Sequence, residues 1–257
     1  MVESPKVDFL IIGAQKAGTT ALNTFLKPHP DIFLHKRLKE LHFFDKDART
    51  DWATPDYALY ERFFAGKRPG QRAGEATPIY AFWPPAAERI ARYNPDMRLI
   101  MCLRNPAERA FSHWQMGRQR RQEWLSFSDA IRTGRHRILI GGLSFNRFSY
   151  VERGFYGEQI ARLHRHFPAE QLLVMTHDTM RSDLHGFLDH ICDFIGVARF
   201  ADYPENRIIR PQQLPPPSGT PNPDDIAYLN TLYREDIEKA ERLTGLDLSA
   251  WRSDDGS

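Results

Sequence analysis

An apolar run, a glycine-containing turn and a helical pattern follow one another at the start of the chain, and this unit most restricts the possible fold. Residues 7–12, VDFLII, are typical of a strand buried on both faces. Residues 17–27, AGTTALNTFLK, have the spacing of an amphipathic helix. A strand buried on both faces belongs in a parallel sheet with helices above and below it. The unit therefore predicts an α/β fold.

The same alternation continues along the chain. Further extended patterns occupy residues 31–36, 71–76, 97–104 and 171–178, and helical patterns occupy residues 56–66, 85–94, 106–120, 127–134, 155–167, 183–196 and 224–245. Residues 135–154 and the Pro-rich residues 207–225 lack a clear period, and we predict surface loops for both. The pattern as a whole predicts a single domain over residues 1–257, with a central parallel sheet flanked by helices.

Composition and charge exclude several classes of protein. The net charge of +2 is too small to indicate a nucleic-acid partner. Cys102 and Cys192 lie in apolar segments, where we expect reduced, buried thiols rather than disulfide or metal chemistry. No apolar run reaches about 18 residues, and no basic stretch precedes an apolar run at the N-terminus. We therefore expect a cytoplasmic protein without a membrane anchor and without a required metal.

The turn between the first strand and the first helix contains a lysine in an unusual place. Gly13 and Gly18 have the spacing of a phosphate-binding loop, but Thr19 stands where the nucleotide-triphosphatase pattern has its lysine, and Lys16 lies inside the loop. A strand, a turn and a helix N-terminus direct several backbone N–H groups and the helix dipole at one anion. The turn therefore predicts an anion site and disfavours a nucleoside triphosphatase.

Four segments in order carry a resemblance to a known family. They are FLIIGAQKAGTTAL, HPDIFLHKRLKELHFFD, GEATPIY and LRNPAERAFSHW, and they run from residue 9 to residue 114. They resemble the sulfotransferases that use 3′-phosphoadenosine-5′-phosphosulfate (PAPS), especially the bacterial and heparan-type N- and O-sulfotransferases. The resemblance implies a P-loop-like strand, loop and helix in the α/β fold, and it implies PAPS as donor with the 3′,5′-bisphosphate PAP as product.

The resemblance also implies binding residues for this donor. The loop that resembles the 5′-phosphosulfate loop of the family consists of Lys16, Ala17, Gly18, Thr19 and Thr20. Arg104 and Ser112 match the pair that binds the 3′-phosphate. PAPS carries two separate anionic groups, and the carboxyl ends of parallel strands share one edge of a sheet, so two loops are needed and can lie together.

Three further residues are candidates for nucleotide contacts. His177 stands where family members often carry a tyrosine near the adenine. Arg207 and Arg210 are candidates for the basic loop that also grips the 3′-phosphate in the family. We expect these contacts to add to those of Arg104.

The expected chemistry is one direct displacement, which requires charge neutralisation on the leaving phosphate and removal of a proton from the acceptor. Lys16 is the candidate for neutralisation. Glu75 matches the catalytic glutamate of the family and is the predicted base, although Ala76 follows it where heparan-type members usually have lysine. His42 is the competing base. Lys39, Glu40 and His42 are candidates for orienting the acceptor.

These expectations describe a sulfotransferase that modifies a hydroxyl group, with an amine as second choice, of a small molecule or a glycan. Two alternatives stay open from the sequence. A P-loop kinase for a small molecule fits the turn but not the position of Thr19. A non-catalytic nucleotide-binding protein fits the anion site but not the glutamate beside it.

Overall fold

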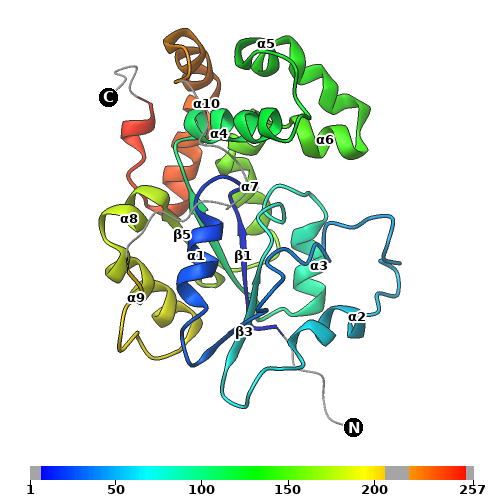
Figure 1. The fold of residues 1–257 in the computed structure, drawn as a ribbon, viewed down its shortest axis with the longest axis vertical. Helices are drawn as coiled ribbons and strands as arrows, with labels where there is room; N and C mark the ends of the chain where they lie inside the picture. The colour runs from blue at the N-terminus through cyan, green and yellow to red at the C-terminus, as the bar shows by residue number, and fades with distance from the viewer. Residues whose placement is uncertain (1–6, 206–219, 253–257) are drawn as a thin grey trace. The chain divides into compact units, whose positions relative to one another are not determined.

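A parallel five-stranded sheet forms the centre of the structure, a computed structural model that describes residues 7–205 and 220–252 (Figure 1). The strand order is β2-β3-β1-β4-β5, and all neighbouring strands are parallel. The strands are β1 (Phe9–Gly13), β2 (Ile32–Leu34), β3 (Arg72–Ala76), β4 (Arg98–Leu103) and β5 (Leu172–Thr176). The predicted α/β fold with a central parallel sheet is therefore confirmed.

The described chain divides into two compact units. Residues 7–103 and 162–205 form the first unit, which contains the sheet, and residues 104–161 and 220–252 form the second. The single domain over residues 1–257 stays a prediction.

Helices lie on both sides of the sheet in the first unit (Figure 1). Phe9 and Ile11 of β1 point to one face and share a buried apolar cluster with α1 (Thr19–Leu26), α8 (His177–Ser182) and α9 (Leu184–Ile195). Leu10 alternates to the opposite face, on the side of α3 (Ala86–Tyr93). The short helices of this unit are α2 (Ala58–Glu61), η1 (Arg62–Phe64) and η4 (Ala169–Gln171).

The second unit is built on the contact between α4 (Pro106–Gln119) and α10 (Pro223–Thr244). Tyr233 of α10 is fully buried, and its hydroxyl donates to the Val151 carbonyl oxygen at 2.8 Å. The other helices are α5 (Phe127–Ile131), η2 (Thr133–Ile140), α6 (Gly142–Phe148), η3 (Glu152–Gly154), η5 (Ser249–Trp251) and α7 (Tyr156–Leu163), the last of which continues into the first unit. No helix in the described ranges combines the length and apolar composition needed to cross a bilayer.

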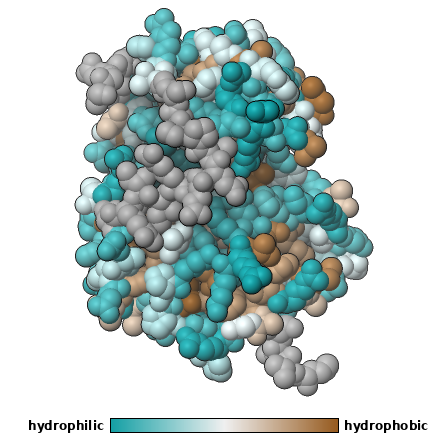
Figure 2. Space-filling model, in the orientation of Figure 1, coloured by the Kyte–Doolittle hydropathy of each residue, from teal (hydrophilic) through white to brown (hydrophobic). Residues whose placement is uncertain are grey.

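The predicted loop over residues 135–154 was wrong, because η2, α6 and η3 occupy most of this segment. Three apolar residues of η2 and α6 do not form a buried face: Leu139, Ile140 and Leu143 are 80%, 79% and 69% exposed. Figure 2 shows this hydrophobic patch over α6 at the upper right. A sequence indicates a helix when its apolar residues repeat along one buried face. The exposed apolar residues of this segment do not produce that repeat. Residues 207–219 of the second predicted loop lie outside the described residues.

Candidate functional site

The turn after β1 holds two residues in the left-handed backbone conformation. Lys16 adopts a left-handed conformation with φ 73°, which is uncommon for a residue with a side chain. Gly18 precedes α1 with φ 87° and has no side chain to cap the helix. The first N–H groups of α1 have no partner within the helix and carry the positive end of its dipole. The turn can therefore receive an anionic group.

His177 lies beside this turn. A Cβ atom added to Gly18 would lie 2.8 Å from Cδ2 of His177 and 2.4 Å from Cε of Met180. His177 does not end a strand, as the pattern over 171–178 predicted; it begins α8, where the Thr176 hydroxyl accepts a hydrogen bond from the Thr179 N–H. The structure thus brings a candidate nucleotide contact next to the candidate anion loop.

Segment 38–45 carries a cluster of charged side chains. The Glu40 carboxylate accepts from Lys39 Nζ at 2.7 Å and lies 3.3 Å from Nε2 of His42. Nδ1 of His42 lies 2.8 Å from Oδ2 of Asp45. The hydrogen bonds with Asp45 and Glu40 raise the pKa of His42 to about 9. Burial favours the neutral form of Glu40, but hydrogen bonds from His42 and Lys39 outweigh it and hold the pKa of Glu40 at about 2.

Glu75 is enclosed in the protein. It is 2% exposed, and β3 places it opposite Leu10, on the face of the sheet away from α1. Oε1 accepts from the hydroxyls of Tyr60 and Tyr80 at 3.1 and 2.9 Å. Oε2 accepts from the Thr77 hydroxyl at 2.7 Å and from the Leu41 N–H at 3.2 Å. Burial raises the pKa of Glu75, although these four donors oppose the shift.

These segments meet at the carboxyl edge of the sheet. β1 and β3 are parallel neighbours, so the turn after β1 and residues 77–82 leave the sheet at the same edge. The Ala81 N–H donates to the Ile12 carbonyl oxygen at 3.0 Å, and the Phe43 N–H donates to the Tyr80 hydroxyl at 2.9 Å. The first unit therefore brings together the end of β1, Glu75 and segment 38–45.

Arg104 and Ser112 belong to the second unit. Arg104 directly follows β4, and its Nε and Nη2 donate to Oε2 of Glu108 at 3.0 and 2.8 Å. Ser112 is half-buried on α4, eight residues after Arg104 along the chain. The Tyr156 hydroxyl donates to the Arg104 carbonyl oxygen at 2.8 Å and fixes the backbone there. Arg207 and Arg210 lie outside the described residues.

Sequence reasoning missed the groups that surround Glu75. Thr77 and Tyr80 stand two and five residues after it, so the segment GEATPIY held a usable signal. Tyr60 and the Leu41 N–H come from other segments, and no local pattern connects them with Glu75. Asp45 was also missed, although it closes the segment KELHFFD.

Comparison with known proteins gives a consistent family. Residues 6–213 match the family model described as "Sulfotransferase domain". The chain is 33% identical over 190 residues to heparan sulfate glucosamine 3-O-sulfotransferase 3B1 of Mus musculus, covering 74% of this chain and 46% of that protein. It therefore spans about half the length of this relative.

Two further matches extend the comparison. The bifunctional heparan sulfate N-deacetylase/N-sulfotransferase 4 of Mus musculus is 29% identical over 220 residues, which cover 80% of this chain and 24% of that protein. The crystal structure of a sulfotransferase from Alicyclobacillus acidocaldarius has a TM-score of 0.81 and 30% identity, and the match covers 97% of this chain and 100% of that one.

Proposed function

Because the chain belongs to the sulfotransferase family, we propose that it transfers the sulfuryl group of PAPS to a hydroxyl group of a glycan or a small molecule. One observation supports this proposal above all: a lysine in a strained turn stands at the start of a helix that has a glycine in its cap position. A phosphosulfate needs such a concentration of N–H groups and positive charge. Lys16, Ala17, Gly18, Thr19 and Thr20 would hold it.

The reaction is a single displacement. The acceptor oxygen forms a bond to sulfur while the bond from sulfur to the bridging oxygen breaks. The electron pair of that bond stays with the 5′-phosphate of PAP, where Lys16 and the N–H groups of α1 neutralise the charge. Arg104 and Ser112 bind the 3′-phosphate, which distinguishes PAPS from nucleotides without this group.

The proton of the acceptor must pass to a base, and Glu75 and His42 are the two candidates. With a pKa of about 9, His42 is protonated at neutral pH and has no lone pair to offer. Glu75 has four donors on its oxygens and little exposure. Glu40 is ionised at neutral pH, and its side chain is 39% exposed. We retain Glu75 as the proposed base, because burial raises its pKa and makes it a stronger base than Glu40, and we retain Glu40 as a residue that orients the acceptor.

The similarity to the relatives indicates only the chemical class of the acceptor. Their names describe transfer to a hydroxyl and to an amine of heparan sulfate. A hydroxyl is the first choice here, because the more similar of the two relatives is an O-sulfotransferase. A kinase is not favoured, because Thr19 occupies the place of the lysine in that class of loop.

Calorimetry of PAP, ADP and 5′-AMP binding without magnesium tests the donor. We expect PAP to bind more tightly than the other two nucleotides, and Arg104→Ala to remove this preference. Transfer of labelled sulfate from PAPS to a panel of hydroxyl acceptors then tests the reaction. Binding of PAP that is no tighter than binding of ADP would overturn the proposal.

A further inference from the structure

Three large apolar side chains protrude at the turn between η2 and α6. Leu139, Ile140 and Leu143 are each at least 69% exposed. A Cβ atom added to Gly141 or Gly142, which form the turn, would meet no atom within 4 Å. Single exposed apolar residues are common, but a group of them marks a contact with a partner. We call Leu139, Ile140 and Leu143 the apolar tip.

A buried ion pair holds the apolar tip in place. Nη1 and Nη2 of Arg137 on η2 donate to the Glu123 carboxylate at 3.0 and 2.8 Å, and the Tyr150 hydroxyl donates to it at 2.9 Å. The Arg137 guanidinium also lies 3.9 Å from the ring centre of Phe148, the last residue of α6. The Glu123 side chain is fully buried, so this link fixes η2 and α6 to the segment that follows α4. The fold therefore holds the apolar tip in solvent.

Trp124 is exposed beside the same ion pair. It is 77% exposed, and its N–H donates to Oε1 of Glu123 at 2.8 Å. Trp124 and the apolar tip are the four most exposed large hydrophobic residues in the described ranges. Tryptophan prefers the boundary between water and lipid, because its ring is apolar and its N–H is polar. The second unit therefore exposes an indole and an aliphatic tip that are fixed to one carboxylate.

The same part of the chain carries an excess of positive charge. Residues 118–147 contain seven arginines and two acidic residues, whereas the whole chain has a net charge of +2. Three of these arginines form ion pairs: Arg132 with Asp225, Arg135 with Glu152 and Arg137 with Glu123. The four that form no ion pair with a described residue are Arg118, Arg120, Arg121 and Arg147. The exposed apolar side chains therefore belong to a region whose cations are only partly neutralised.

Apolar and cationic groups are neighbours in this region. Leu143 and Arg147 are four residues apart on α6, so they lie on the same side of the helix, and both are exposed. Nη1 of Arg118 donates to the Trp124 carbonyl oxygen at 3.1 Å. Figure 2 shows hydrophilic side chains directly beside the hydrophobic patch over α6. A partner must therefore offer apolar groups and negative charge next to each other.

An anionic lipid membrane offers this combination better than other partners do. A charged glycan would pair with the arginines but gains nothing from aliphatic side chains. A second copy of this chain, in a symmetric contact, would place the arginines of one copy against those of the other. A protein partner needs a groove that matches the protruding tip, whereas a fluid bilayer adapts to it. Lipid tails accept the apolar side chains, and lipid phosphates accept the arginines.

We propose that the second unit binds the surface of anionic membranes, with the apolar tip and Trp124 inserted among the headgroups and with Arg118 and Arg147 on lipid phosphates. Insertion of this kind places the protein on the membrane surface without spanning it. The proposal goes beyond sulfuryl transfer and does not depend on it, because none of these residues belongs to the proposed donor site.

Sedimentation of the full chain with lipid vesicles tests the proposal. One set of vesicles contains phosphatidylcholine alone, and the other also contains about 30% phosphatidylserine. We expect binding to the second set only, and weaker binding as the salt concentration rises. Leu139→Ser combined with Ile140→Ser should weaken binding at least about tenfold, because two aliphatic side chains no longer leave water. Arg147→Gln should weaken it about fivefold.

Two exposed residues of the first unit provide matched controls. Leu59 is 52% exposed and Arg49 is also exposed, so each repeats one of the substitutions away from the apolar tip. Leu59→Ser and Arg49→Gln should leave vesicle binding within about twofold. All variants should keep the Tm and the PAP affinity of the wild type, because every substituted side chain faces solvent.

Fluorescence gives a second readout. Trp124 is the most exposed of the tryptophans, all of which the structure describes. Its emission should therefore move to shorter wavelength when vesicles of the second set remove the indole from water. Trp124→Phe should abolish most of this shift.

Three results would overturn the proposal. The first is a protein that sediments with neither set of vesicles. The second is binding to the phosphatidylserine vesicles that the double variant retains, since charge alone would then explain the contact. The third is concentration-dependent dimerisation that the double variant abolishes, which would assign the apolar tip to a second copy of this chain. A protein that binds PAP normally but binds no vesicles would leave the proposed function intact.

Discussion

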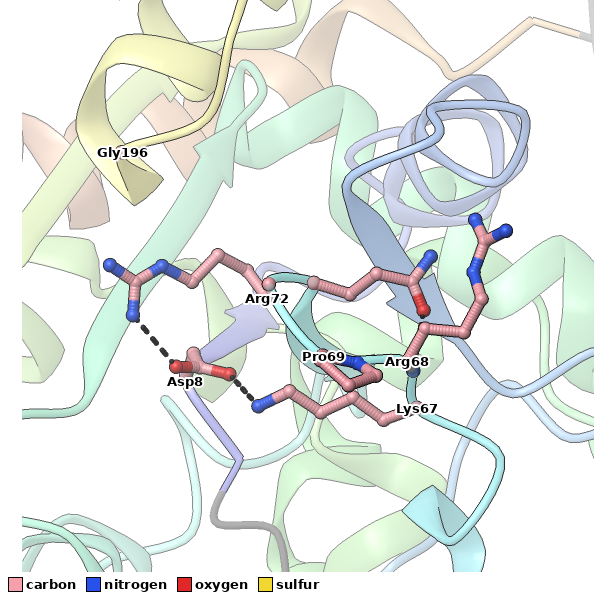
Figure 3. A pocket seen from close by; sticks show the side chains of 8 residues that line it. Asp8, Lys67, Arg68, Pro69, Arg72 and Gly196 are labelled. Atoms are coloured by element: carbon pink, nitrogen blue, oxygen red, sulfur yellow. Dashed lines mark hydrogen bonds and ion pairs between the residues drawn. The ribbon is translucent and has the colours of Figure 1, made fainter.

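The two edges of the central sheet both gather cationic side chains, but the cations have different surroundings. At the amino edge, Lys67 and Arg72 share the Asp8 carboxylate at 2.8 and 3.0 Å (Figure 3). Arg68 donates to the Pro30 carbonyl oxygen. At the carboxyl edge, Lys16 lies in a left-handed turn at the uncapped start of α1. The amino edge pairs its cations with a fixed carboxylate, and the carboxyl edge places a lysine at the positive end of a helix dipole.

This difference shows that the size of a cavity is a poor guide to the site here. The amino edge has an open cavity of about 540 Å³. It is lined by Asp8, Lys67, Arg68, Pro69, Gly70, Gln71, Arg72 and Gly196. An anionic ligand there would compete with the Asp8 carboxylate, which already forms ion pairs with Lys67 and Arg72. We therefore expect chemistry at the carboxyl edge and stability at the amino edge.

The largest effect should come from the lysine of the turn. Lys16→Ala should lower kcat about 10²–10³-fold, because the charge on the leaving phosphate loses a preorganised partner. Lys67→Ala, the same change at the amino edge, should leave kcat within about twofold. Steady-state transfer from PAPS measures both. Equal losses in the two variants would erase the distinction between the edges.

Arg104→Ala should have the next largest effect. A charge-assisted hydrogen bond to phosphate contributes about 1.5–3 kcal/mol, so PAP affinity should fall about 10–100-fold. Affinity for 5′-AMP, which lacks the 3′-phosphate, should change little. Calorimetry of both nucleotides gives the ratio. If Arg72→Ala lowered PAP affinity as much, the amino edge would have to be counted as a nucleotide site.

Asp8→Asn should affect stability rather than turnover. The Asp8 carboxylate accepts hydrogen bonds from Lys67, from Arg72 and from the Ala73 N–H. Asparagine carries no negative charge, so the variant would lose both ion pairs. We expect a loss of about 1–2 kcal/mol in the free energy of unfolding, which lowers Tm by about 2–4 °C per kcal/mol. Thermal denaturation and kcat, measured on the same preparation, check this. A large loss of kcat without a change in Tm would contradict it.

The smallest effect concerns pH at the carboxyl edge. The pKa of His42 rises from 6.5 to about 9 in the folded protein, so the folded state binds this proton more tightly than the unfolded chain. The stabilisation is complete below about pH 6.5 and is lost as the pH rises through 9. We expect about 1 kcal/mol, because the side chain is 34% exposed and solvent screens the charges. Denaturant titrations from pH 6 to pH 9.5 should show this loss in the wild type and not in His42→Asn.

The sequence predicted the elements that depend on local pattern. The apolar run predicted where β1 ends, and Pro106 predicted the start of α4. Gly196 and Gly245 predicted the ends of α9 and α10, and both adopt the left-handed conformation after these helices. The segment 135–154 was missed because Leu139, Ile140 and Leu143 face solvent, so its helices leave no amphipathic signal.

A site residue could be predicted from the sequence where its role depends on neighbours in the same segment. Lys16 inside the turn could be read from its spacing to two glycines. The environment of Glu75 could not, because Tyr60 and Leu41 reach it only after α2 and segment 38–45 fold over β3. The charge of His42 was equally hidden, since it depends on Asp45 and Glu40 closing around both ring nitrogens.

The left-handed backbone at Lys16 and His42 has a consequence for protein engineering. A left-handed residue with a side chain costs about 1–2 kcal/mol, and glycine relieves this cost at the expense of a more flexible unfolded chain. A library selected only for heat resistance would therefore tend to accept glycine at position 16. Such a selection would enrich stable but inactive variants. A library of this protein therefore needs to be selected for turnover as well as for stability.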